Sequence, residues 1–413
     1  MTEPPTTPPP DPRHPTPPSS VPSTTEARLL DEFTGTGLDW RSTIAVPALA
    51  IVSALIVGAV VIALGDLDTL RLWTTDPGRA VGDTLSNVGG GYKALFLGAV
   101  GGIGPISETL TRAAPLILAG LALAIGFQAG LFNIGAQGQM IFGGMFAVTV
   151  GFSLNLPAFI HIPLCIVAGI IGGAIWGAIP GWLRAKSGAH EVITTIMLNF
   201  IALRLLDYGL TRDFFQVPGR NDPVSKSVES TALYPKLFAW LDPRHRVHMG
   251  IIVALLVALV VYWLLFRSTI GFQFRAVGAN PDGARYAGMS VVWLTVAVMA
   301  VSGGLAGLAG ADLVLGPLGR ATPGFAGNVG FDAIAIALVG RSHPFGVVAA
   351  GLLFGGLAAG GQAMQASTAI GIDVVSVIQA LIIVFIAAPA LIRAIYRVRA
   401  DTESTQVTQG WAT

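Results

Sequence analysis

The sequence predicts an all-α protein that crosses a membrane several times. Of its 413 residues, 53% are hydrophobic and only 11% are charged, which is less than half the charged share of a typical soluble domain. Several apolar runs are long enough for a helix to cross a hydrocarbon core of about 30 Å. The runs lack the alternation of barrel strands, and backbone groups in lipid must bond internally, so we expect helices.

The composition of the chain and the spacing of its reactive residues argue against several classes of function. The formal net charge of +1 argues against nucleic acid as a partner. The single cysteine, Cys165, cannot form an internal disulfide or a cysteine-rich metal site. None of the six histidines has a second metal ligand at a suitable spacing, and no nucleophile is patterned with a base. We therefore expect no catalytic residue, no metal site and no enzyme activity of the chain's own.

The chain divides by composition into two tails and a membrane domain. Residues 1–42 are rich in Pro and Thr, which predicts a disordered cytoplasmic tail. Residues 43–394 form the transmembrane domain, and residues 395–413 form a cytoplasmic C-terminal tail. About ten crossings are expected, including short or re-entrant segments. The expected spans lie at residues 43–64, 113–131, 139–156, 158–183, 192–209, 249–266, 289–310, 331–340, 344–361 and 374–392.

Two apolar stretches are too short to cross a membrane unaided. Residues 331–340 are counted as one crossing but predict a half-span or re-entrant helix. Residues 92–102 are predicted to lie at the membrane interface. With ten crossings both termini lie on one side, and Arg184 and Lys186 in a short loop favour the cytoplasm for that side.

Glycines recur at every fourth position in two regions. Gly169, Gly173, Gly177 and Gly181 form one stripe, and residues 351–360 carry two further pairs at the same spacing. Small residues at this spacing let transmembrane helices approach closely. We expect this packing to occur inside one subunit rather than between subunits.

Four motifs carry a resemblance to a known family. They are GLFNIGAQGQM at residues 130–140, HEVITTIMLNFIA at 190–202, RAVGANPDGARYAGM at 275–289 and GFDAIAIALVGRSHPFGV at 330–347. Together, and in this order, they resemble the membrane subunit of an ATP-binding cassette (ABC) importer. The family is that of nucleoside, simple-sugar and branched-chain amino acid permeases, and the motif forms are most similar to nucleoside permeases. The resemblance covers residues 91–394.

The resemblance implies the partners of the chain. Such a subunit forms the translocation pathway and binds no cofactor; ATP and Mg are used by a separate ATPase, which typically has tandem nucleotide-binding domains. No phosphate-binding GxxxxGK[ST] loop is present in this sequence. The resemblance further implies a second permease subunit, related or identical, and an extracytoplasmic substrate-binding lipoprotein, all within membrane lipid.

The cytoplasmic loop at residues 267–288 is the expected docking element for the ATPase. Asn280-Pro281 predicts a helix start, because proline suits the first turn, and Gly288 predicts a left-handed helix end. Arg285 offers a forked donor to partner carboxylates. Alternatively, the arginines merely hold the loop at the cytoplasmic face. The expected coupling residues are Arg275, Gly278, Asn280, Pro281, Ala284, Arg285 and Gly288.

Polar side chains inside the spans are candidates for the translocation pathway, because such groups are costly in lipid. Amide side chains could contact sugar hydroxyls or base edges, or else satisfy the backbone of a broken helix. Glu191 could act at a gate, or complement the positive end of its helix. Arg204 and Asp207, three residues apart, are expected to pair structurally. The pathway candidates are Asn133, Gln137, Gln139, Glu191 and Asn199.

The spans offer few charges to a charged substrate. This scarcity favours a neutral substrate, with a nucleoside first and a simple sugar second. The alternative function is an ATP-independent secondary transporter or facilitator for a small polar solute. Such carriers usually need a buried carboxylate near the membrane midplane. The spans offer little beyond Asp207, which lies near a span end.

Overall fold

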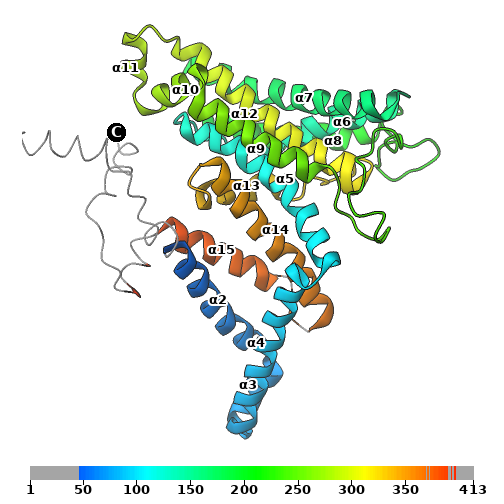
Figure 1. Cartoon of the computed structure of the whole chain (residues 1–413), viewed down its shortest axis with the longest axis vertical. Coiled ribbons are helices and arrows are strands. Elements are labelled where there is room, and N and C mark those ends of the chain that lie inside the picture. Colours follow the sequence, from blue (N-terminus) through cyan, green and yellow to red (C-terminus); the bar gives the residue numbers. More distant parts are fainter. Residues whose placement is uncertain (1–45, 369, 372, 389–391, 393–394, 397–413) are drawn as a thin grey trace, which may run out of the picture. The chain divides into compact units, whose positions relative to one another are not determined.

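Helices are the only regular elements in the part of the chain that the structure describes. The structure is a computed structural model that describes residues 46–368, 370–371, 373–388, 392 and 395–396. Residues 49–413 form one unit, which holds the helices discussed below (Figure 1). The expected N-terminal tail and nearly all of the C-terminal tail lie outside the described residues.

Seven of the described helices are long and apolar enough to cross a membrane, which confirms an all-α polytopic protein. They are α2, α5, α7, α8, α9, α14, and α12 with its π-helical extension η2. The helices are α2 (Val46–Gly65), α3 (Leu67–Thr75), α4 (Pro77–Val100), α5 (Ile103–Gln128), α6 (Ala136–Ser153), α7 (Ala158–Ser187), α8 (Glu191–Leu210), α9 (Gly250–Arg267), α10 (Thr269–Ala279), α11 (Pro281–Tyr286), α12 (Val291–Leu313), η2 (Val314–Leu318), α13 (Val329–Val339), α14 (Pro344–Ser367) and α15 (Asp373–Ala387).

Two expectations about helix boundaries were wrong. The stretch at residues 92–102 is not a separate interfacial element, because it forms most of the second half of α4, which packs on α14. Gly98 and Gly360 meet there without an intervening side chain. The span expected to end at residue 310 continues as α12 and η2 to Leu318. The sequence-based end of that span came too early: Asp312 follows closely, but the residues after it, Leu313–Leu315, are apolar again.

Helix α5 lies at the centre of the packing in residues 49–413. Its middle is buried by α9, α12, α13 and α14. Small residues such as Ala113, Ala122 and Gly120 occupy the contact positions, so neighbouring backbones approach closely. At Gly120, an added Cβ would lie 2.8 Å from side-chain atoms of both Ile336 and Val347.

The glycine stripe of α7 packs inside the chain, as expected. A Cβ on Gly173 would lie 2.2 Å from the carbonyl oxygen of Gly303 in α12, and Gly307 meets Gly169 in the same way. The stripe is therefore the seam between α7 and α12, the most extensive helix contact described. In α14, Gly355 packs on α5 in the same manner.

Helix α13 is a half-span, as its length predicts. Its 11 residues measure about 16 Å, roughly half of a hydrocarbon core. It begins against α6, where the Gly330 N–H donates to the side chain of Gln137 (2.9 Å). The loop after α13 returns to the end of α5, where Gln128 donates to the carbonyl of Ser342 (3.3 Å).

Candidate coupling and translocation site

The predicted coupling loop consists of two helices, α10 and α11, at the end where α9 stops and α12 begins (Figure 1). The short helix α11 was expected, whereas α10 was read as loop. The Asn280 side chain accepts from the Gly283 N–H (2.9 Å), and Pro281 occupies the first turn. Gly288 has φ +81 and donates to the Arg285 carbonyl (3.0 Å), which completes the expected left-handed end.

Two side chains of α11 are exposed in the part of the chain that the structure describes. Tyr286 is 95% exposed, although it is aromatic. Arg285 is also exposed, and among the described residues it pairs with Asp282 (3.1 Å), so its guanidinium can exchange that partner for another carboxylate. Ala284 is buried and faces the chain instead. Arg275 lies over the ring of Phe266 (5.3 Å), which anchors α10 to α9. Docking itself stays a prediction.

The backbone of α10 touches the end of α5. A Cβ on Gly278 would lie 2.6 Å from the carbonyl carbon of Ala129, and a Cβ on Gly130 would lie 3.0 Å from the Gly278 Cα. Gly130 has φ +67, a conformation that favours glycine. Glycine at position 278 is therefore explained by close approach to the break that follows α5.

Asn133 and Gln139 hold that break together. The Asn133 amide donates to Gln139 (2.9 Å) and to the Ser302 hydroxyl of α12 (2.9 Å). Its oxygen accepts from the Gly135 N–H (2.9 Å) and from the Gln139 amide (3.1 Å). Ser302 in turn donates to the carbonyl of Ala122 in α5 (2.7 Å). Asn133 thereby satisfies a backbone N–H of the irregular segment between α5 and α6, and Gln139 holds the Asn133 side chain in place.

Gln137 and Asn199 bind the same region to other helices. Gln137 accepts from Gly330 and donates to the carbonyl of Gly327 (2.6 Å), which fixes the start of α13. Asn199 of α8 accepts from the Gly138 N–H (2.8 Å) and donates to the carbonyl of Ile134 (2.9 Å). All four amide candidates thus meet around one break, and a direct role in the pathway stays a prediction.

Glu191 lies apart from the amides, at the start of α8. It is buried and forms an ion pair with Arg184 at the end of α7. The pair closes the short loop that joins these two helices. The Glu191 carboxylate lies in the first turn of α8, where it complements the positive end of the helix dipole. This was one of the two interpretations of Glu191 drawn from the sequence.

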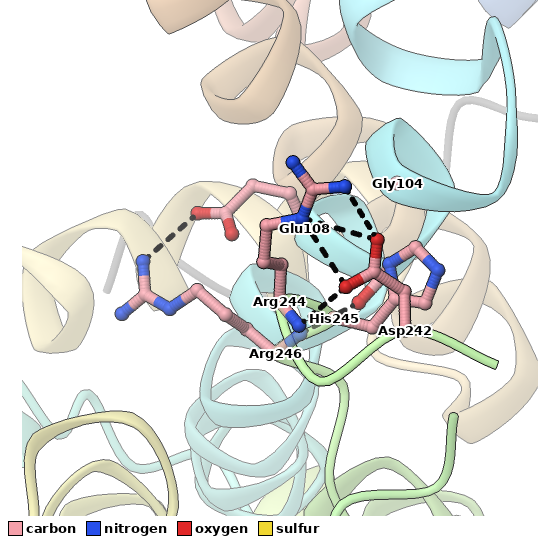
Figure 2. Close-up of a pocket in the computed structure, with 7 residues that line it drawn as sticks. Gly104, Glu108, Asp242, Arg244, His245 and Arg246 are labelled. Carbon is pink, nitrogen blue, oxygen red and sulfur yellow. Dashed lines mark hydrogen bonds and ion pairs between the residues drawn. The ribbon is translucent and has the colours of Figure 1, made fainter. Parts of the chain in front are cut away.

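A polar cavity of about 350 Å³ lies at the opposite end of α5, between its first turns and the loop at residues 242–246. In Figure 2, Arg244 points to Asp242, and Arg246 points to Glu108, with N–O distances of 2.9 and 3.7 Å. The hydrogen bond from Arg244 lowers the pKa of Asp242 to about 2. The 26 residues of α5 span about 39 Å, so this cavity and α11 belong to opposite membrane faces.

Sequence reasoning missed a buried polar group at the end of α12. Asp312 is fully buried, and neither carboxylate oxygen has a hydrogen bond among the described residues. It lies 3.9 Å from His248, beside Tyr234. The expectation that the spans hold little beyond Asp207 was therefore wrong. The signal was present in the sequence, but the span had been ended two residues too early.

Arg204 and Asp207 do form the expected pair, at 3.4 Å, and they do so on the outward face of α8. The Arg204 side chain is 82% exposed. Asn199, five residues before Arg204, is buried on the inward face. The only charged pair within α8 thus faces away from the rest of the described chain.

Comparisons with known proteins agree with this arrangement. The chain matches the model of the family described as branched-chain amino acid transport system / permease component over residues 106–387. The guanosine ABC transporter permease protein NupP of Bacillus subtilis (strain 168) is 42% identical over 308 residues, covering 74% of this chain and 88% of that protein. The glucose ABC transporter permease protein TsgB13 of Haloferax volcanii is 36% identical over 347 residues, covering 82% and 86%.

A second protein of Bacillus subtilis, the guanosine ABC transporter permease protein NupQ, is 26% identical over 266 residues, covering 60% of this chain and 79% of that protein. No solved structure matches the chain. The family match includes the break after α5, helix α8, the α10–α11 element and α13. This chain is a multi-pass membrane protein and belongs to the family of permease components of branched-chain amino acid transport systems.

Proposed function

We propose that the chain is the permease subunit of an ATP-driven ABC importer and forms the translocation pathway for nucleosides or simple sugars. The observation that carries this proposal is α11, a capped and exposed helix within a family of transport permeases. A short helix whose two ends are fixed by caps can transmit a displacement from a partner subunit to the rest of the chain. ATP and Mg are used by that partner, the ATPase.

A neutral substrate fits the charges of the spans. The buried carboxylate of Glu191 is already paired with Arg184. Asp312 lies near the end of α12 that adjoins the outer loop at residues 211–249. A zwitterionic amino acid would need partners for both of its charges. In the described spans, Glu108 lines the cavity but is already paired with Arg112, and Glu191 is paired with Arg184. Because NupP carries the word guanosine in its name and TsgB13 the word glucose, we place nucleosides first and simple sugars second.

The second permease subunit is a related chain, not a copy of this one. Bacillus subtilis has two guanosine ABC transporter permease proteins, NupP and NupQ, and this chain is far more similar to the first. We infer that a NupQ-like chain completes the pathway. An extracytoplasmic binding lipoprotein delivers substrate to the membrane face that carries the cavity beside Arg244 and Arg246.

The experiment is uptake of radiolabelled guanosine and glucose by vesicles that contain the chain with its transporter partners. ATP-dependent guanosine uptake, abolished by Arg285→Glu at unchanged expression, is the expected result. Arg220→Glu is the matched control, because Arg220 is also exposed and paired with a near neighbour, Asp222, but lies in the outer loop. Guanosine uptake that continues after ATP depletion would support an ATP-independent carrier instead.

A further inference from the structure

A single residue, Asn280, joins helices α10 and α11. Asn280 ends α10, with its N–H donating to the Ala276 carbonyl (3.0 Å), and its side chain caps α11. Because Phe274 is only 2% exposed, α10 is also anchored in the core. A displacement of α11 is therefore expected to move α10 through Asn280.

The next contact in line is backbone on backbone. Gly278 lies against Gln128 and Ala129. A Cβ added to Gly278 would lie 2.8 Å from the Gln128 carbonyl oxygen. On the other side, Gly130 lies against the Gly278 carbonyl. Side chains absorb small displacements by changing rotamer, whereas packed backbones do not. This contact is thus a stiff connection between α10 and the end of α5.

The segment after Gly130 is short and held at both ends. The Leu131 N–H donates to the Gly126 carbonyl (2.9 Å), and two residues later Asn133 is bonded to α6 and α12. A shift of Gly130 must be taken up by rotation within residues 131–132 or by rearrangement of the Asn133 bonds. Either change alters the junction of α5, α6 and α12.

Backbone strain lies at the same end of α5. Arg341 and Ser342 both have positive φ, 53 and 52, although neither is glycine. Ser342 accepts from the Gln128 side chain, directly before the Gly278 contact. Non-glycine residues in this conformation cost free energy and cluster at functional sites, switch regions among them. These strained residues therefore lie beside the contact between Gly278 and the end of α5.

We propose that the contact between Gly278 and Ala129–Gly130 passes the movement of α11 to the break between α5 and α6. Gly278 and Gly130 are then positioning residues for transport: they touch neither ATP nor substrate. The inference rests on the proposed function, since it presupposes an ATPase at α11.

Hydrogen exchange of the assembled transporter tests the proposal. The full complex is compared without nucleotide and with a non-hydrolysable ATP analogue. The expected result is a nucleotide-dependent change in amide exchange both at residues 281–289 and at residues 126–139. A change at 281–289 with none at 126–139 would overturn the relay but leave the proposed function intact. In a second comparison, of the chain purified without the ATPase and within the full complex, equal exchange at 281–289 would contradict the proposed function itself.

The variant Gly278→Ala tests the contact. Its Cβ meets backbone, so we expect uptake per ATP hydrolysed to fall by about 2- to 30-fold while the ATPase still binds. Exchange at 126–139 should also lose its response to nucleotide. The matched control is Gly90→Ala, because a Cβ there meets nothing within 4 Å. An unchanged uptake-to-ATP ratio in Gly278→Ala would overturn the proposal. If that variant does not fold, the wild-type exchange result decides alone.

Discussion

Asn133 shows how a polar side chain in a membrane protein can serve structure. It makes four hydrogen bonds within 3.1 Å, to Gly135, Gln139 and Ser302. The residue type and its place beside two glycines were visible in the sequence. The partner Ser302 lies 169 residues away and emerged only from the packing of α12 on α5.

Replacing Asn133 tests this account. Asn133→Ala leaves Gln139 and the Gly135 N–H without buried partners, which we expect to cost about 1–3 kcal/mol of stability. The measurement is the thermal unfolding temperature in detergent. Asn155→Ala, at an exposed asparagine, should change stability by less than about 0.5 kcal/mol. An unchanged unfolding temperature with an altered KM for uptake would instead assign Asn133 to the pathway.

His248 makes stability depend on pH. Its Nδ1 accepts from the Gly250 N–H (3.1 Å), so the buried ring is neutral. Burial and then Arg246 lower the pKa of His248 to about 4. Tyr234 and Asp312 also face the ring. The unfolded chain, with a histidine pKa near 6.5, takes up a proton first as the pH falls.

Stability contributed by His248 is therefore complete above about pH 6.5 and is lost as the pH falls towards about 4. The loss amounts to roughly 3 kcal/mol. We expect the unfolding temperature of the wild type to fall over this window more steeply than that of His248→Asn, whose side-chain oxygen can still accept from Gly250. Parallel slopes for the two proteins would refute the assignment.

Among the elements, the seam between α7 and α12 depends on glycine. Gly173→Ala places a Cβ 2.2 Å from a carbonyl oxygen of Gly303, so the helices must separate. We expect a loss of about 1–3 kcal/mol, measured by thermal unfolding. Gly90→Ala serves as the control, since its Cβ meets nothing and the substitution should be neutral or slightly stabilising. Equal unfolding temperatures would show that the seam is not tightly packed.

The sequence predicted strongly apolar elements better than mixed ones. The spans, the short α13 and the caps of α11 follow from hydropathy and from local chemistry, which one segment contains by itself. Helix α10 was read as loop, because its 11 residues mix glycines with polar residues. The first half of α4 carries Arg79, Asp83 and Asn87, so hydropathy missed it. Helix α10 is held by the packing of Gly271, Phe274 and Val277, which is not a local property. The first half of α4 is mostly exposed, and its start is capped by Asp76.

For the whole molecule, α5 fixes the arrangement of the two functional ends. Its last residues meet Gly278 and the break, and its first residues line the polar cavity with Glu108. Charge counting gave only a weak indication of sidedness, whereas the length of α5 separates the two ends across the membrane. Which helix is central, and which amides meet, depends on contacts between distant segments and could not be predicted from the sequence.

The central claim is that α11 docks on an ATPase at the cytoplasmic face. The most direct measurement is site-specific photo-cross-linking in native membranes, with a photoreactive amino acid at Tyr286 or, as control, at Trp240. Both side chains are highly exposed, 95% and 80%, and they lie towards opposite ends of α5. The account predicts that position 286 captures the ATPase subunit and position 240 does not. Capture of the ATPase from position 240, or from neither position, would contradict it.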